Sequence, residues 1–222
     1  MSKSVMNASR KFATVPTANI DRSTFDRSHG AKWTQDCDYL IPFFLDEVLP
    51  GDTMKMKAQL FGRLATPINP IMDRCTLKSY FFFVPCRLLW DNWERFMGQQ
   101  DKPTDSIDYT IPNASLTFST SRLGEITDYF GLPAGQSGTA SAPVNMLPFR
   151  AYHLIIDEWF RSQDLQESSI ISTGDSGSTI CTNTTLMPSF SDSLAVRKIT
   201  KAHDYFTSCF PVTIGARVEA SV

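Results

Sequence analysis

The sequence lacks most of the patterns that mark secreted, membrane-spanning and metal-binding proteins. Its N-terminus, MSKSVMNASRKF, has no apolar stretch of the kind that a secretory signal requires. The longest apolar run, residues 80–85, is far shorter than the roughly 20 residues that cross a bilayer. The 5 cysteines are widely spaced and form no C-x-x-C pair, the spacing that structural zinc sites use. We therefore expect no membrane insertion, no disulfide framework, no metal and no cofactor.

An excess of positive charge is also missing. The 222 residues carry 21 Lys and Arg against 23 Asp and Glu, a formal net charge of −2, so the chain as a whole has no field that attracts nucleic acid. Hydrophobic residues make up 42% and aromatic residues 12%, which excludes a wholly disordered chain. With 13 Pro and 11 Gly, the composition favours short strands joined by long loops over a helical bundle.

The first 36 residues differ from the rest in charge and in pattern. Six Lys or Arg stand against three Asp in residues 1–36, a local formal charge of +3, and little apolar periodicity is present. We expect these residues to form an extended N-terminal arm that becomes ordered on a partner surface. A solvated tail is the alternative interpretation.

Strand patterns follow the arm. Residues 39–46 are apolar around Pro42, which confines such a strand to an edge or a bulge. Residues 53–64 alternate, with Met and Leu on one face and Lys on the other, as in a half-buried strand. Residues 76–84 include a run that is apolar on both faces, which requires cover on two sides. We therefore expect three strands of a β-sandwich here, with Phe82 in the packing core.

Three apolar stripes at helical spacing come after these strands. They cover residues 89–97, 123–130 and 149–160, with a Gly after each of the first two and Pro148 at the start of the third. Between the last two stripes, residues 133–143 predict a loop of Gly, Ser and Ala. Stacking on nucleic-acid bases is the alternative role for the aromatic rings of the stripes. The remaining members of our predicted packing core are Trp93, Tyr152 and Trp159.

One loop resembles a catalytic motif. Residues 174–178 read GDSGS, which is similar to the GDSGG loop around the nucleophile of trypsin-like serine proteases. That chemistry needs a His to accept the proton of Ser176 and an Asp to orient this His. His203 follows the serine in the chain, the wrong order for that family, and Ser178 replaces the last Gly. We interpret the motif as a polar loop and assign no catalytic residue; a serine hydrolase built around Ser176 is the alternative.

Longer blocks of the sequence resemble the major capsid proteins of gokushoviruses, the Microviridae subfamily of small single-stranded DNA phages. The blocks are RSTFDRSHG at 22–30, YLIPFFLDEVLPGD at 39–52, RLATPI at 63–68, FFFVP at 81–85, LWDNW at 89–93, LPFRAY at 147–152, EWFR at 158–161 and KAHDYFTSC at 201–209. They occur in the order of the family, and several motifs in order are more specific than any single one.

The resemblance implies a mainly β fold, a viral jelly-roll β-sandwich with long loops and helical insertions. It also implies a structural subunit and no enzyme: copies assemble into a small icosahedral shell, the virion, around single-stranded DNA. Expected partners are further copies, other phage structural and scaffolding proteins, the packaged DNA and the host cell surface, with assembly in the bacterial cytoplasm. Lys3, Arg10 and Lys11 are the residues that we expect to face the DNA. A non-catalytic β module that binds glycans or cell surfaces is the competing function.

Members of the family are longer than this chain, and residues 210–222 depart from their pattern. We expect an N-terminal portion of a subunit: the arm at 1–36, then part of a jelly-roll domain at 37–222 with a helical insertion at about 86–165. Without further strands, the predicted strands would have unpaired edges. The 222 residues alone should then be insoluble, partly molten or dependent on a partner.

Overall fold

The structure is a computed structural model, and it describes residues 21–72, 74–106, 108–117, 122–134, 141–163, 165–183, 187 and 189–200. The chain divides into two units, Met1–Lys32 and Trp33–Val222. In the first unit, residues 21–32 are extended and exposed, and a local turn forms where Asp26 Oδ1 accepts hydrogen bonds from the backbone N–H and the hydroxyl of Ser28, at 3.0 and 2.5 Å. The three residues that we expect to face DNA lie outside the described residues: Lys3, Arg10 and Lys11.

The predicted arm ends at residue 36, but two of its residues already contact the second unit's other segments. The Trp33 ring stacks on Phe43 with centroids 5.7 Å apart, and the Thr34 carbonyl accepts a hydrogen bond from the Tyr129 hydroxyl at 3.0 Å. The second unit therefore includes the last residues of the predicted arm, from Trp33 on.

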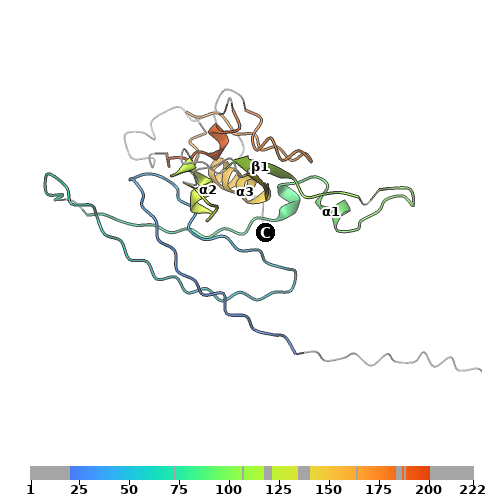
Figure 1. The fold of residues 1–222 in the computed structure, drawn as a ribbon, viewed down its shortest axis with the longest axis horizontal. Coiled ribbons are helices and arrows are strands. Elements are labelled where there is room, and N and C mark those ends of the chain that lie inside the picture. The colour runs from blue at the N-terminus through green and yellow to red at the C-terminus, as the bar shows by residue number, and fades with distance from the viewer. Residues whose placement is uncertain are drawn as a thin grey trace, which may run out of the picture. The chain divides into compact units, whose positions relative to one another are not determined.

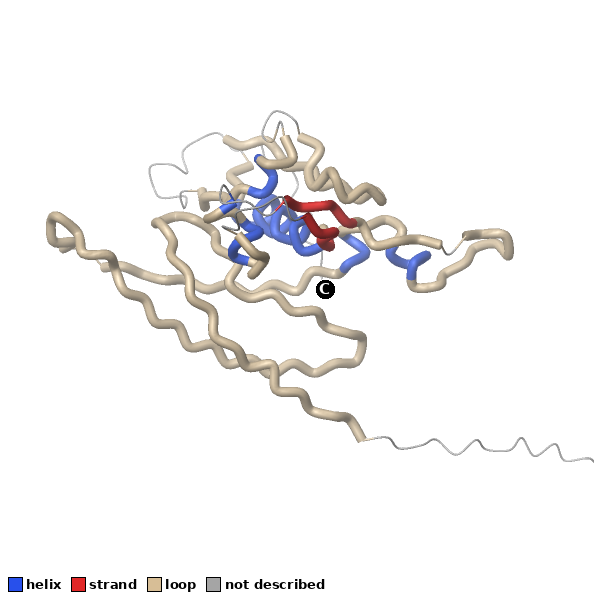
Figure 2. Tube along the Cα trace, in the orientation of Figure 1, coloured by secondary structure: helices blue, strands red, loops and turns tan. Residues whose placement is uncertain are grey.

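Regular secondary structure begins only at residue 86 among the described residues, as the tube in Figure 2 makes plain. In chain order the elements are the 3-10 helix η1 (Cys86–Leu88), α1 (Trp93–Phe96), β1 (Asn113–Thr117), α2 (Ile126–Tyr129), β2 (Ser141–Asn145), α3 (Leu147–Ile155), the π-helical turn η3 (Ile156–Phe160) and the 3-10 helix η4 (Asp192–Leu194). Figure 1 labels the α-helices and β1 within one folded body. We call residues 86–200 the helical body.

The three strands predicted before residue 86 are not strands in this structure. The described residues of 39–46, 53–64 and 76–84 carry no strand ladder; a single bridge joins Tyr39 to Lys198. Alternation in the sequence selects which side chains share a face, but a strand also needs a neighbour that takes up its N–H and C=O groups. Within the described chain, no segment provides this neighbour, and the correction therefore concerns pairing and not the extended conformation.

A small antiparallel sheet forms where a loop was predicted. β1 pairs with β2 in a register that runs from Asn113 opposite Asn145 to Thr117 opposite Ser141, so β2 occupies the end of the predicted loop 133–143. Pro143 within β2 hid the strand from sequence reasoning, because proline is excluded from central strands. A two-stranded sheet has only edge strands, and Pro143 is accommodated there opposite Ser115.

The three predicted helices are confirmed, although each is shorter than its stripe. α1 and α2 are followed by Gly98 and Gly131, with φ of 99° and 81°, a left-handed conformation that glycine adopts without steric cost. α3 has Pro148 in its first turn, where the missing N–H leaves no hydrogen bond unmade.

α3 is buried on more than one side and organises the core of the helical body. The main cluster gathers side chains from α3, β1, α2, η3, η4 and the loops between them: Leu116, Ile126, Met146, Phe149, Tyr152, Ile156, Ile180 and Leu194. A second cluster joins η1 to the start of α3: Leu89, Trp90 and Leu147. The body therefore has two apolar clusters, each built across residues that are distant in sequence.

The four aromatic residues predicted for the core differ in how far they are buried. Tyr152 is buried and Trp93 is half-buried. Phe82 and Trp159 instead have 36% and 70% of their surface exposed, which corrects the expectation of burial for both. The helical stripe continues to residue 160, but the π-helical turn η3 changes the angular spacing of its last residues, and Phe82 lies on a segment with no cover on one side.

Candidate interaction surface

Residues 53–84, which we call the extended segment, present apolar side chains to solvent. Phe61, Ile68 and Met72 are 95%, 101% and 96% exposed. Further exposed apolar residues in the segment are Met54, Met56, Leu60, Leu64, Ile71, Leu77, Tyr80, Phe81, Phe82 and Phe83. Single exposed apolar residues are ordinary in soluble proteins, but a run of this length forms an apolar surface that the described residues leave uncovered.

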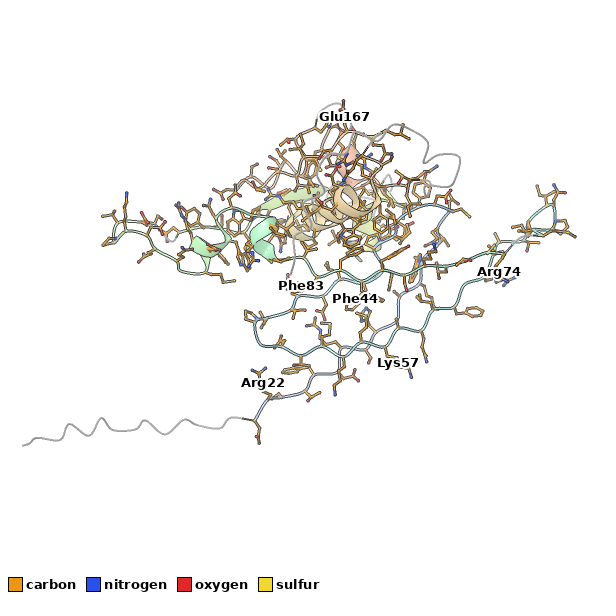
Figure 3. All side chains as sticks on the ribbon, turned by 180° about the vertical axis from the view of Figure 1, so that it is seen from behind. Arg22, Phe44, Lys57, Arg74, Phe83 and Glu167 are labelled. Atoms are coloured by element: carbon orange, nitrogen blue, oxygen red, sulfur yellow. The ribbon has the colours of Figure 1, made fainter. Side chains whose placement is uncertain are left out.

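The same segment is basic. Its exposed cations alternate with or flank the apolar residues: Lys55, Lys57, Arg63, Arg74 and Lys78. Figure 3 labels Lys57 and Arg74 on stretches of backbone that have no helix or strand. Five basic residues against the single acid Asp73 give the segment a formal charge of +4, although the whole chain carries −2. The surface is therefore both apolar and positively charged.

Aromatic rings attach the end of the extended segment to the helical body. Tyr80 meets Phe160 edge to face with centroids 5.3 Å apart, and Phe82 lies 6.0 Å from Phe160 and 5.6 Å from Trp159. Ring pairs at these distances add about 0.5–1.5 kcal/mol each beyond simple burial. Phe83, labelled in Figure 3, remains 77% exposed. One face of this run is thus held by η3 and the other is open.

Tyr152 joins the two ends of the described second unit. Its hydroxyl donates a hydrogen bond to the Leu40 carbonyl at 2.9 Å and accepts one from the Arg197 backbone N–H at 3.0 Å. Burial raises the pKa of Tyr152 to about 12, so the hydroxyl keeps its proton and both bonds. The neighbouring backbone bonds from Leu40 to Arg197 and from Ile199 to Asp38, 2.9 and 2.8 Å long, complete the junction.

His153, the residue after Tyr152 in α3, forms a hydrogen bond with η4. Its Nε2–H donates to the Ser193 carbonyl at 2.6 Å, and Nδ1 has no hydrogen-bond partner in the described part of the chain. The ring is buried, and this burial lowers the pKa of His153 to about 4. The histidine is therefore neutral near pH 7 and serves as a structural donor.

Arg150 organises the GDSGS loop, and this residue was missed by sequence reasoning. Its side chain is fully buried. Nη1 donates to the Leu89 carbonyl at 3.0 Å, and Nη2 donates to the carbonyls of Gly174 and Ser176 at 2.9 and 2.7 Å. Desolvation lowers the pKa of the guanidinium from its ordinary value of 12.5. The only signal in the sequence was a charged residue among the apolar residues of a predicted helix.

Hydrogen bonds to Asp175 hold the GDSGS loop as well. Asp175 accepts hydrogen bonds from the Trp90 indole at 2.6 Å and from the Asn92 amide at 2.9 Å. These two bonds, that of Asn92 first, lower the pKa of the Asp175 carboxyl. A Cβ added at Gly177 would overlap the backbone of Asn113, so glycine is required where the loop crosses β1. The motif is explained by packing and hydrogen bonding.

The arrangement around Ser176 does not resemble a catalytic triad. Ser176 Oγ hydrogen-bonds to Ser178 Oγ at 2.7 Å, while His153 is buried and bonded to the backbone of Ser193. His203 lies outside the described residues. The carbonyl of Ser176, and not its hydroxyl, is the group that the loop presents to the buried Arg150.

Other chemistry finds no assembled site in the described ranges. Nowhere among them do three His, Cys, Asp or Glu side chains group as metal ligands, and no described helix is long and apolar enough to cross a membrane. Four cysteines there are free thiols: Cys37, Cys75, Cys86 and Cys181. Burial raises the pKa of Cys181 to about 12, so its thiol stays protonated and unreactive.

Comparison with known proteins identifies the family of the chain. Residues 13–222 match the family described as "Capsid protein (F protein)". The chain is 45% identical over 200 residues to capsid protein VP1 of Bdellovibrio phage phiMH2K, covering 90% of this chain and 35% of that protein. It is 43% identical over 211 residues to capsid protein VP1 of Chlamydia phage 1, again 90% and 35%, and 31% identical over 202 residues to that of Spiroplasma virus 4, 87% and 34%.

These matches confirm the resemblance that the sequence blocks indicate. They also show that the chain spans about a third of the length of the curated relatives it matches.

Proposed function

Because the chain belongs to the capsid protein (F protein) family, we propose that it forms part of a structural subunit of a phage capsid. In this role copies of the subunit associate into a closed shell, the virion, and the chain catalyses no reaction. The relatives that support the proposal are named capsid protein VP1.

The observation that carries the proposal is the contrast between a packed body and an exposed segment. The helical body buries Trp90, Phe149 and Met146 almost completely, so the chain contains the means to form a core. The extended segment nevertheless exposes Phe61, Ile68 and Met72. Exposed apolar area is worth about 25 cal/mol for each Å² that a partner removes from water, and assembly subunits use such area to associate.

We further infer that the extended segments become strands of a jelly roll in the whole subunit. Residues 39–46, 53–64 and 76–84 are extended already, and the second of these alternates between apolar and polar residues as a half-buried strand does. A jelly roll pairs strands that are distant in sequence. Strand partners supplied by other parts of a subunit would cover the apolar faces that are open here.

The partners of such a shell follow from the same role. We propose further copies of the subunit, other structural and scaffolding proteins of the phage, single-stranded DNA inside and a host surface outside, with assembly in the host cytoplasm. Lys3, Arg10 and Lys11 are the proposed DNA-facing residues, and each phosphate contact adds about 0.7 to the slope of affinity against salt on logarithmic scales for a single strand. Deleting residues 1–12 from a full-length subunit should therefore lower the DNA content of particles; unchanged DNA content contradicts the assignment.

Neither competing function has an observation in its favour. A serine hydrolase would need a base beside Ser176, whose hydroxyl instead bonds to Ser178. Failure of Ser176 to react with a fluorophosphonate probe is the expected result. A dedicated glycan-binding module would not need a segment of 32 residues with apolar side chains on its exposed faces.

Association of the 222-residue chain tests the proposal directly. We expect concentration-dependent association in sedimentation velocity, which the triple variant Phe61→Ser, Ile68→Ser, Met72→Ser should weaken at least tenfold in concentration. A matched control replaces apolar residues that are exposed on the helical body, Leu123→Ser and Leu165→Ser, and should leave association unchanged. A wild-type chain that stays monomeric up to 100 µM, about the upper range of such measurements, would contradict the proposal.

A further inference from the structure

We propose that residues 189–200 form a strap that is released from α3 when His153 takes up a proton, while the rest of the helical body stays folded. These residues include η4, and we call them the η4 strap. The inference concerns a conformational change within this chain, so it goes beyond the proposed capsid function and does not depend on it.

The η4 strap is held to the body by few contacts. Among its residues, all of which the structure describes, Leu194 is the single buried apolar side chain, with Phe190 and Val196 partly buried against the same cluster. The strap pairs with the rest of the described chain through one isolated bridge, Tyr39 to Lys198, and not through a strand ladder. A segment with so small an apolar anchor can open without unfolding the core beneath it.

His153 contacts the strap through a hydrogen bond that leaves one of its ring nitrogens unpaired. The ring is fully buried, and its Nε2–H donates to the Ser193 carbonyl at 2.6 Å. Nδ1 then carries no proton, and it has no hydrogen-bond partner in the described part of the chain. A proton on Nδ1 creates a buried cation with an unpaired donor, and such a group is far more costly to bury than the neutral ring.

Charged and titratable groups face His153 from three elements. Tyr152 precedes it in α3 and meets its ring edge to face, with centroids 5.4 Å apart. Asp157 in η3 favours a proton on the ring, whereas Arg197 in the strap disfavours it. Asp192, the acid of η4, is hydrogen-bonded within the strap itself, to the backbone N–H and the hydroxyl three residues before it.

Asp157 is the acid that acts on His153, but its carboxylate is already occupied. It accepts hydrogen bonds from the hydroxyl of Ser168 and the backbone N–H of Ser169, both at 2.8 Å, and Arg161 Nε lies 3.1 Å from its Oδ1. These contacts fix the carboxylate, which makes no hydrogen bond with Nδ1 of His153. Release of the strap admits water to the ring, and water then accepts the added proton's hydrogen bond.

The strap can move at a lower cost than α3. The buried side chains of α3 include Phe149 and Tyr152, which belong to the main cluster, so displacement of the helix would open the core. Displacement of the strap uncovers chiefly Leu194 and breaks its two backbone hydrogen bonds with residues 38–40. Residues 38–40 should therefore lose their partners together with the strap.

Hydrogen exchange at individual amides of the 222-residue chain tests the proposal at pH 7 and pH 5, after division by the intrinsic exchange rate at each pH. Burial lowers the pKa of His153 from 6.5 to about 4 in the closed chain. Because the released ring titrates near its ordinary value, the open fraction should rise about twentyfold between pH 7 and pH 5. The reporters are the amides of Leu40, Arg197 and Ile199, each of which donates a hydrogen bond at the junction.

Amides of the body show whether the strap opens by itself. The N–H groups of Phe130 and Arg150 donate to the carbonyls of Ile126 and Met146, inside the packed part of the chain. They should exchange more slowly than the strap amides by about tenfold or more at both pH values. Equal rates for the two sets mean that the strap opens only by global unfolding, and this result overturns the inference.

Two variants assign the pH dependence to His153. His153→Gln keeps a side-chain N–H for the Ser193 carbonyl but does not titrate, so the rise in exchange between pH 7 and pH 5 should disappear. Tyr152→Phe removes the hydroxyl that joins Leu40 and Arg197. Its strap amides should exchange faster at both pH values, with the same rise on acidification.

The rise between pH 7 and pH 5 decides the proposal. Its absence in the wild type overturns the inference. Its persistence in His153→Gln overturns it as well, because a carboxylate such as Asp157 or Asp192 then controls the strap. Self-association of copies, which tests the proposed function, is measured separately and bears on neither outcome.

Discussion

Residues 80–84 and residues 86–90 lie next to each other in the chain, yet their apolar side chains have opposite fates. Phe83 is 77% exposed and Trp90 is completely buried. Trp90 is covered because a loop from residues 172–180 crosses it and accepts its indole hydrogen bond through Asp175. No described segment crosses Phe83 in this way. Hydrophobicity sets the free energy available on burial, whereas a covering neighbour decides whether that free energy is gained.

The largest expected difference in stability between the two regions comes from removing one cation in each, Arg150 in the helical body and Lys57 in the extended segment. We expect Arg150→Leu to lower the free energy of unfolding by about 3–5 kcal/mol, because it removes a buried guanidinium that donates to the carbonyls of Leu89, Gly174 and Ser176. In the extended segment, removal of another cation through Lys57→Leu should change stability by less than about 0.5 kcal/mol. Urea denaturation at low protein concentration measures both.

Arg150→Lys is the matched control, since it keeps the charge but loses the planar fork that reaches several carbonyls. It should retain part of the stability. An Arg150→Leu chain as stable as the wild type would show that the GDSGS loop does not depend on the guanidinium.

Truncation of one phenylalanine in each region gives the next largest effect. Phe149→Ala should cost about 3–5 kcal/mol, because its side chain is buried and meets Phe130 at 5.1 Å. Phe82→Ala should cost about 1 kcal/mol in the isolated chain, since more than a third of the ring is already exposed.

In assembled full-length particles the two costs should converge, because we expect Phe82 to be covered there, and the cost of Phe82→Ala should rise to about 3–5 kcal/mol. Thermal unfolding of both variants, free and assembled, checks the comparison. Equal costs in the free chain would mean that the segment is as well packed as the body.

Acid should destabilise the helical body through His153. Its pKa is lowered by burial to about 4, from an ordinary value of 6.5, and the charges of Arg197 and Asp157 act on it in opposite directions. Between these two values the unfolded state binds a proton that the folded state does not, so the free energy of unfolding falls as pH falls. The loss should reach about 3 kcal/mol at pH 4 and grow no further below it.

Denaturation of the wild type and of His153→Gln at pH 7.5, 5.5 and 4.5 measures this contribution as the difference between their slopes. Carboxylates that titrate in the same range affect both proteins alike. Parallel pH profiles would show that the ring of His153 can be protonated without cost in the folded chain.

The smallest expected effect concerns two glycines. Gly177→Ala should destabilise the chain by about 1–3 kcal/mol, because the added Cβ overlaps the backbone of Asn113 in β1. Gly62→Ala in the extended segment meets no atom within 4 Å and should cause no measurable loss. Melting temperatures of the two variants compare the regions once more; a tolerated alanine at Gly177 would indicate that the loop can move away from β1.

Parts of the fold were predictable because their signals are local. The stripes at residues 89–97, 123–130 and 149–160 predicted α1, α2 and α3, and the glycines at 98 and 131 predicted where the first two end. Helical spacing and left-handed caps act within a few residues, so they can be recognised in one sequence. The family could likewise be recognised from the capsid-like blocks, because their order depends only on position along the chain.

The packing of individual side chains was less predictable. Trp159 lies on an apolar stripe but is exposed, because the π-helical turn η3 rotates it away from the core. β2 was missed since Pro143 argues against a strand everywhere except at an edge. Arg150 gives no sequence pattern of its own, because its four carbonyl contacts come from loops 24 to 61 residues away.

The sequence by itself determined the helices, the family and which side chains share a face of each extended stretch, since all of these depend on spacing along the chain. Only the tertiary structure decided that Arg150 holds the GDSGS loop, that Tyr152 bridges Leu40 and Arg197, and that the face of Phe83 is open. Long-range contacts of this kind depend on which segments meet in space. A burial or a hydrogen bond has two partners, and the pattern of one segment contains only one of them.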